Sequence, residues 1–126
     1  MNNYQMKDMK PGMSAKITKT ITKEMMTEFG KMTGDLNPFH EQVAHGLLTS
    51  SIFSAIAGMH LPGKNALLMS TEFQFVLPVI PGDELNYEAE ITSVNSDFKF
   101  IDLKLDCTNQ NGLQVIRGKM RVGVKE

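Results

Sequence analysis

The sequence has one cysteine, no tryptophan, no long hydrophobic run and no excess of either charge. With Cys107 alone, no disulfide can form within the chain and no cluster of thiolates can bind a metal, so we expect a reducing, cytoplasmic location. Lysine and arginine number 13 against 14 acidic residues without any basic run, so nucleic acid is not an expected partner. No apolar stretch approaches a membrane span and the N-terminal segment lacks the apolar core of a signal peptide, so no membrane partner is expected.

The length of 126 residues predicts a single domain, residues 1–126, with one core. Residues 1–13 are polar and contain Pro-Gly, which predicts a loose lead-in. Residues 14–22 alternate between apolar and polar side chains, as a half-buried strand does. Residues 22–32 place apolar side chains three and four positions apart, which is typical of a short amphipathic helix.

Residues 45–60 are apolar over most of a helical circumference and contain no carboxylate, lysine or arginine, so they predict a buried helix. Four strand-like segments follow, at 65–79, 85–94, 98–108 and 113–124, and short turns separate them. Short turns make neighbouring strands antiparallel. The order of elements therefore predicts an α+β fold in which an antiparallel sheet wraps around one long central helix.

The segment between the two predicted helices, "TGDLNPFHEQVAHG" at 33–46, places a carboxylate and an imidazole close together. Pro38 stiffens the backbone between Asp35 and His40, so the two side chains can be directed at one point. Such a pair can hold a water molecule and move its protons. Alternatively, Gly-Asp and Asn-Pro are only turn formers, and His40 is a surface histidine.

His45 and Gly46 open the predicted buried helix. The first turn of a helix has amide donors without intrahelical partners, and together with the helix dipole they can bind a carbonyl oxygen that gains negative charge. Alternatively, Gly46 only relieves crowding at the start of the helix. The pairing of an acid and an imidazole directly ahead of this start favours the chemical interpretation.

The other reactive side chains fit structural roles better. His60 stands beside the Leu-Pro-Gly that ends the buried helix, where the dipole favours a histidine. Cys107 falls on the apolar face of its strand and is expected in the core. The histidines lack the helical spacing of a zinc site, and the serines near residue 50 lack a nucleophile-elbow pattern, so neither a metal nor a cofactor is expected.

Three motifs carry a resemblance to a known family. "TGDLNPFH" at 33–40 resembles the Gly-Asp-x-Asn-Pro-x-His signature of the MaoC-like, or (R)-specific enoyl-CoA hydratase, family. "VAHGLLTSSIFSAIAGMHLPG" at 43–63 and "FQFVLPVIPGDEL" at 73–85 are similar to its central helix and to a later segment. The resemblance implies a hot-dog fold, usually a homodimer, acting without a cofactor on acyl-CoA or acyl-carrier-protein thioesters of fatty-acid metabolism.

The chemistry implied by the resemblance is reversible syn addition of water to a trans-2-enoyl thioester, which gives an (R)-3-hydroxyacyl thioester. Asp35 and His40 would hold and activate the water, and the amide of Gly46 would bind the thioester carbonyl. Asn37 would support the loop.

One departure from the family concerns the connection after the motif histidine. In relatives this connection is longer, whereas here "HEQVAHG" runs directly from His40 into the helix. Either the overhang that covers the acyl chain is truncated, which would strain the geometry of Asp35 and His40, or residues are missing from the sequence.

The sequence leaves two alternatives to the hydratase function. A hot-dog thioesterase typically uses a carboxylate from the central helix, and residues 45–60 contain none. A non-catalytic acyl-CoA-binding or regulatory module would not need Asp35 and His40 together.

Two expectations concern the pocket and the assembly. Helical spacing from Gly46 places Ser50, Ser54 and Ala57 on one face with small side chains, so we expect them to line the acyl pocket. The bulky opposite face is expected to pack on the sheet; it comprises Leu48, Ile52, Ile56 and Met59. Phe98 and Phe100 fall on the strand face opposite the core and need a cover, which favours a homodimer that pairs two sheets edge to edge.

Overall fold

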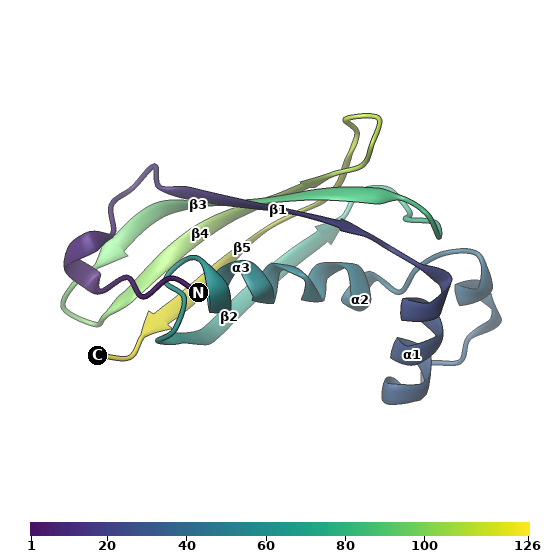
Figure 1. The fold of residues 1–126 in the computed structure, drawn as a ribbon, viewed down its shortest axis with the longest axis horizontal. Coiled ribbons are helices and arrows are strands. Elements are labelled where there is room, and N and C mark those ends of the chain that lie inside the picture. The colour runs from purple at the N-terminus through teal and green to yellow at the C-terminus, as the bar shows by residue number, and fades with distance from the viewer.

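The computed structural model describes residues 1–126 and has one curved antiparallel sheet with a central helix on its inner side and another helix beyond one end of that central helix (Figure 1). The strands are β1 (Ser14–Thr20), β2 (Ala66–Phe75), β3 (Glu84–Asn95), β4 (Phe100–Thr108) and β5 (Gln114–Val124). The helices are η1 (Met6–Asp8), α1 (Lys23–Thr33), η2 (Pro38–Glu41), α2 (Gly46–Ser51) and α3 (Phe53–Met59). The spatial strand order is β1-β3-β4-β5-β2, so β1 and β2 are the two edges.

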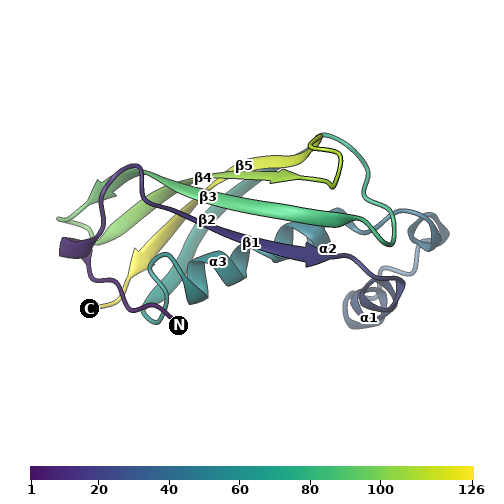
Figure 2. The same cartoon turned by 45° about the horizontal axis from the view of Figure 1, so that its top comes forward.

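The sheet curves over α2 and α3, which run beneath it as one central helix (Figure 2). The predicted alternation is confirmed, because every second side chain is buried from Leu85 to Ile91 in β3 and from Ile101 to Cys107 in β4. These inward side chains are Leu85, Tyr87, Ala89, Ile91, Ile101, Leu103, Leu105 and Cys107. The fold is therefore the predicted α+β hot-dog arrangement, with the core between the sheet and the central helix.

The central helix changes its hydrogen-bonding pattern at Ile52, where α2 passes into α3. The hydroxyls of three successive residues, Thr49, Ser50 and Ser51, donate to the carbonyls three positions earlier, at 2.9, 3.3 and 2.6 Å. Hydroxyls that bond back to their own helix commonly bend it. The buried residues Thr49, Phe53 and Ala57 nevertheless follow one another at four-residue steps across this change.

The predicted division of the central helix into a pocket face and a sheet face holds only in part, because Leu48 and Ile56 are buried as expected but Met59 and Ala57 are not where the division places them. Phe53 and Ile56 are fully buried and Ala57 is only 5% exposed, whereas Met59 is 46% exposed. Ala57 belongs to the core cluster, because it lies four positions after Phe53 and therefore shares the inward side of α3 with it.

The first 13 residues are not the loose lead-in that the sequence predicts. Met6 and Met9 are buried in the core cluster. The backbone amide of Asn2 donates to the carbonyl of Met59 at 2.8 Å, and that of Tyr4 donates to the carbonyl of Pro62 at 3.0 Å. The two buried methionines and the backbone hydrogen bonds thus fix this segment, although its mostly polar composition predicts a loose one.

The two edges of the sheet differ in character. β1 carries Lys16 and Lys19, and charged side chains on an edge oppose pairing with another strand. β2 instead exposes large apolar side chains, with Leu67 at 64% and Met69 at 55% exposure. Of the two residues predicted to form an uncovered apolar surface, Phe98 is exposed as predicted, at 79%, whereas Phe100 is partly buried.

Phe100 is covered within the chain, because the Arg121 guanidinium carbon lies 4.1 Å from the centre of its ring. Phe98 stands in the turn between β3 and β4. None of the helices is both long and apolar enough to span a membrane.

Candidate active site

The loop after α1 is held by hydrogen bonds between side chains and backbone groups that are two residues apart. Gly34 ends α1 with a φ of 81°, a conformation that glycine adopts without strain. The Asp35 carboxylate accepts from the amide of Asn37 at 3.3 Å, and the Asn37 side chain accepts from the amide of Phe39 at 3.0 Å. Pro38 then occupies the first turn of η2. Asn37 therefore supports the loop by capping η2.

Asp35 and His40 are brought together by this loop. Nε2 of His40 lies 3.3 Å from Oδ2 of Asp35. Nδ1 of His40 lies 2.9 Å from the carbonyl oxygen of Val43, and because a carbonyl only accepts, Nδ1 must donate. Nε2 then faces the carboxylate with a lone pair when the ring is neutral and with a proton when it is charged. The pair can take up and release a proton at this point.

The short connection after His40 does not prevent this geometry. His40 lies in η2 and its ring is tied to Val43, two residues before His45. The side chains of Asp35 and His40 are 48% and 21% exposed, so water can reach both. Asp35 and His40 therefore come together even though the connection after His40 is short.

Gly46 is the first residue of α2, and its amide has no acceptor within the chain. A Cβ at this position would lie 3.0 Å from the ring of Phe75, which is tighter than ordinary contact. Glycine thus fits without displacing Phe75 where the end of β2 comes close to the start of the helix. The amide of Gly46, which has no acceptor within the chain, can bind a ligand oxygen.

A cavity of about 350 Å³ connects His40 with Gly46, and its walls are mostly apolar. It is lined by Phe39, His40, Val43, Ala44, Gly46, Thr49, Phe75, Val76, Leu77, Pro78, Val79 and Ile116. A smaller hollow of about 240 Å³ on the side of α1 is lined by Asp35, His40 and His45 among others. His40 lines both hollows, so it lies where the two meet.

The residues predicted to line the acyl pocket are not found in this cavity. Ser50 and Ala57 are buried against the core, and Ser54 is exposed on the other side of the helix. The end of β2 and the segment after it, from Phe75 to Val79, take that place. The motif "FQFVLPV" contains these residues, and its apolar run beyond the alternating part was the signal for them.

His45 is the site residue that sequence reasoning left without a role. It is 4% exposed and its ring stacks on that of His40, with centroids 3.8 Å apart and planes at 23°. Donor atoms of Asp35, His40 and His45 all lie within 4.8 Å of one another. Zinc would need to lie about 2.0–2.1 Å from a nitrogen in the plane of each ring, and two nearly parallel stacked rings do not converge on such a point. The arrangement therefore fits proton transfer better than metal binding.

The remaining candidates are structural. His60 follows α3 as its C-cap residue, and its carbonyl accepts from the side chain of Asn2 at 3.2 Å. Cys107 is fully buried, and burial raises the pKa of its thiol to about 12, so it is not a nucleophile. Burial likewise raises the pKa of Tyr87, whose hydroxyl donates to the Thr49 carbonyl at 2.6 Å.

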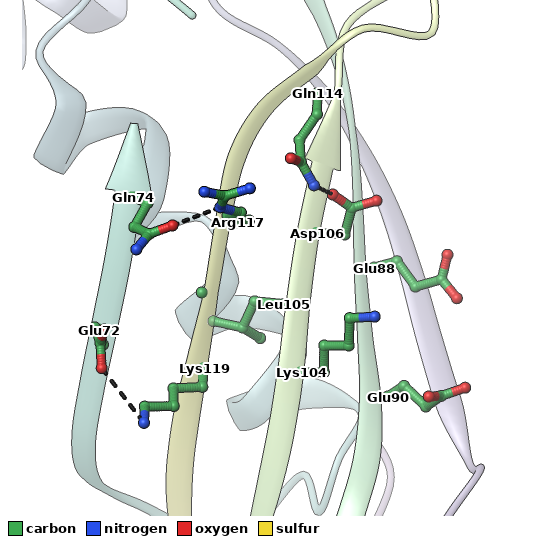
Figure 3. Close-up of a pocket in the computed structure, with 11 residues that line it drawn as sticks. Glu72, Gln74, Glu88, Glu90, Lys104, Leu105, Asp106, Gln114, Arg117 and Lys119 are labelled. Carbon is green, nitrogen blue, oxygen red and sulfur yellow. Dashed lines mark hydrogen bonds and ion pairs between the residues drawn. The ribbon is translucent and has the colours of Figure 1, made fainter. Parts of the chain in front are cut away.

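A hollow of about 700 Å³ lies on the outer face of the sheet, away from the helices (Figure 3). Its polar side chains pair with one another: Lys119 lies 3.5 Å from Glu72, and Gln114 donates to Asp106 at 2.6 Å. It contains no histidine and is open to solvent. Because charged side chains of both signs line a hollow that is open to solvent, we interpret it as a solvated sheet face.

Comparisons with known proteins agree with the geometry. Residues 6–110 match the family described as MaoC like domain. The chain is 30% identical over 133 aligned positions to an (R)-specific enoyl-CoA hydratase of Rhodospirillum rubrum, covering 96% of this chain and 92% of the relative. It is 28% identical to an (R)-specific enoyl-CoA hydratase of Aeromonas caviae, covering 86% and 90%.

Among solved structures, the unliganded R-hydratase PhaJ1 from Pseudomonas aeruginosa superimposes with a TM-score of 0.92 at 26% identity, covering 98% of this chain and 87% of that one. The alignment with the Rhodospirillum relative has 133 positions, more than the 126 residues of this chain, so the relative carries residues that this chain lacks. The chain belongs to the MaoC-like family.

Proposed function

We propose that this protein is an (R)-specific enoyl-CoA hydratase, which adds water to trans-2-enoyl thioesters and removes it from (R)-3-hydroxyacyl thioesters. The observation that carries the proposal is that the Asp35–His40 pair and the free amide of Gly46 lie at the same end of the central helix. The named activities of the Rhodospirillum and Aeromonas relatives support it. Those names also favour coenzyme A as the carrier.

The reaction requires two functions that this site provides. A water held at Nε2 of His40 and Oδ2 of Asp35 loses a proton to the pair as its oxygen bonds to C3 of the substrate. Negative charge then develops on the thioester oxygen, where the amide of Gly46 can stabilise it. The pair returns a proton to C2, so the water is consumed and the enzyme is restored.

The mostly apolar cavity beside Gly46 fits the acyl part of such a substrate. Phe39, Val76, Leu77 and Ile116 provide its apolar walls, and His40 stands at its inner end. Apolar walls with few polar groups are usual for small-molecule sites. The reacting carbons can thus approach the pair of groups while the chain stays out of water.

The protein is proposed to act as a homodimer through the edge strand β2. Leu67 and Met69 expose apolar surface along an edge whose backbone groups have no partner within the chain. Pairing two β2 edges would continue the sheet and cover this surface. Because Phe75 ends β2 and closes over Gly46, the partner would lie next to the site.

The two rival functions fit the structure less well. A thioesterase in this fold would need a carboxylate from the central helix, and α2 and α3 contain none. A binding module would not need a carboxylate and an imidazole 3.3 Å apart with access to water.

The experiment that tests the proposal is hydration of crotonyl-CoA, followed by the loss of ultraviolet absorbance of the conjugated thioester. We expect turnover that disappears in the Asp35→Asn variant. Release of free coenzyme A by the wild-type protein would support the thioesterase instead. Binding of crotonyl-CoA without either reaction would support the binding module.

A further inference from the structure

The structure assigns His45 a function in the reaction. We propose that it is a positioning residue: its imidazole holds the backbone of Asp35 and forms the surface on which the His40 ring rests. The inference rests on the proposed hydratase function, because it concerns the two groups that would carry the proton.

The first observation is the hydrogen bond to Asp35. Nε2 of His45 lies 3.1 Å from the backbone carbonyl oxygen of Asp35, which belongs to a stretch without helix or strand. A Cβ at Gly30 would lie 3.1 Å from this same oxygen and 3.7 Å from Nε2 of His45, so glycine in α1 leaves the space for the bond. The bond therefore ties a loop residue to the rigid start of α2.

The second observation is the packing of the ring. One face of His45 stacks on His40 at 3.8 Å, and Phe29 of α1 meets His45 edge-on at 5.0 Å and 60°. Because the His45 ring contacts the rings of both His40 and Phe29 and is only 4% exposed, it has little freedom to rotate. The ring of His45 is thus a fixed support for the ring of His40. The polar contacts of His40 are with Val43 and Asp35 of the loop.

The third observation is the state of the second ring nitrogen. Nδ1 of His45 is buried and has no hydrogen-bond partner. Because the Asp35 carbonyl only accepts, Nε2 must carry the proton, and a neutral ring then has its lone pair at Nδ1. A charged ring would bury an N–H without an acceptor, and would place two positive rings face to face once His40 is protonated. His45 therefore orients the pair of groups without exchanging protons.

Three variants separate the two contacts of His45. His45→Gln keeps an N–H donor toward Asp35 but loses the stack, His45→Phe keeps a ring for the stack but loses the donor, and His45→Ala loses both. Tyr87→Phe is the matched control, because it removes another buried hydrogen bond to the same helix without touching Asp35 or His40.

We expect His45→Ala to lower kcat for crotonyl-CoA roughly 10- to 100-fold with KM within about twofold, since a misplaced catalytic group affects the chemical step. Gln and Phe should each restore part of kcat, whereas Tyr87→Phe should keep it at a similar loss of melting temperature. If kcat instead follows the melting temperature across all four variants, His45 is only a structural residue and the inference is overturned.

A second measurement does not depend on activity. The chain has three histidines, so ¹⁵N resonances of their rings can be assigned from single variants. We expect His45 in the tautomer with the proton on Nε2, and we expect the His40 resonances to move in His45→Gln and His45→Ala but not in Tyr87→Phe. A proton on Nδ1 of His45, or unmoved His40 resonances, would overturn the inference. An inactive wild-type protein with the expected spectra would overturn only the proposed function.

Discussion

The two ends of the central helix contrast with each other. At its C-terminal end the chain satisfies the exposed carbonyls itself: Asn2 donates to Met59, and Gly63 donates to Ala57. At its N-terminal end the amide of Gly46 has no acceptor, and Asp35 and His40 lie beside it. Both ends have a histidine, His60 at the C-terminal end and His40 at the N-terminal end. At the N-terminal end, His40 is paired with the Asp35 carboxylate and lines a cavity together with Gly46. The closed end serves stability, and the open end is where a substrate can bind.

The largest effect is expected from the Asp35–His40 pair. Asp35→Asn and His40→Ala should each lower hydration of crotonyl-CoA by about 100-fold or more, the usual scale for groups that transfer protons. Both side chains lie on a partly exposed loop, so the melting temperature should change little. A variant that retains nearly wild-type turnover would remove its residue from the mechanism.

Gly46→Ala tests the free amide next. The added Cβ would lie 3.0 Å from the Phe75 ring, so the ring or the start of α2 must shift. We expect kcat to fall roughly 10- to 100-fold, the effect of losing one donor to a developing oxyanion. The double variant Gly46→Ala with Phe75→Leu, which makes room, should recover part of this loss. Full activity in Gly46→Ala would argue against an oxyanion role.

Leu67→Lys tests whether the chain forms a homodimer through β2, next to the N-terminal end of the central helix. A lysine on the exposed apolar edge of β2 should turn a dimer into a monomer in sedimentation at micromolar concentration, because charge on an edge opposes strand pairing. Thr18→Lys on β1, the other edge, is the control and should leave the assembly unchanged. A wild-type protein that is already monomeric would contradict the proposed dimer.

The smallest effect is expected at the closed end. His60→Ala should keep turnover within about twofold of wild type, because His60 contacts the chain mainly through its backbone there. The same assay as for His40→Ala makes the two histidines directly comparable. A large loss of kcat in His60→Ala would break the contrast between the two ends.

The parts of the fold predicted from the sequence depend on local patterns. The buried rows from Leu85 to Ile91 and from Ile101 to Cys107 follow from alternation alone, because successive strand residues point to opposite faces. Asp35, His40 and Gly46 were predicted from a loop and a helix start that are recognisable in the sequence, and their roles came from the resemblance of the surrounding motifs to a known family. Each of these features is decided within a few residues.

The features that the sequence did not reveal depend on contacts between distant segments. Met6 and Met9 are buried because α3 and the sheet provide a place for them, which a polar segment does not signal. Ala57 faces the core because it shares the side of α3 on which Phe53 packs against Phe73 and Tyr87 of the sheet. The role proposed for His45 rests on Phe29 and His40, which the fold brings to its ring.

The most direct test of the account is the stereochemistry of hydration in D₂O. If one Asp35–His40 pair holds the water and returns its proton, both parts of the water reach the double bond from the same side. The account predicts that crotonyl-CoA gives (R)-3-hydroxybutyryl-CoA with deuterium added syn at C2, as read by NMR of the product. The (S) product, or anti addition, would contradict it.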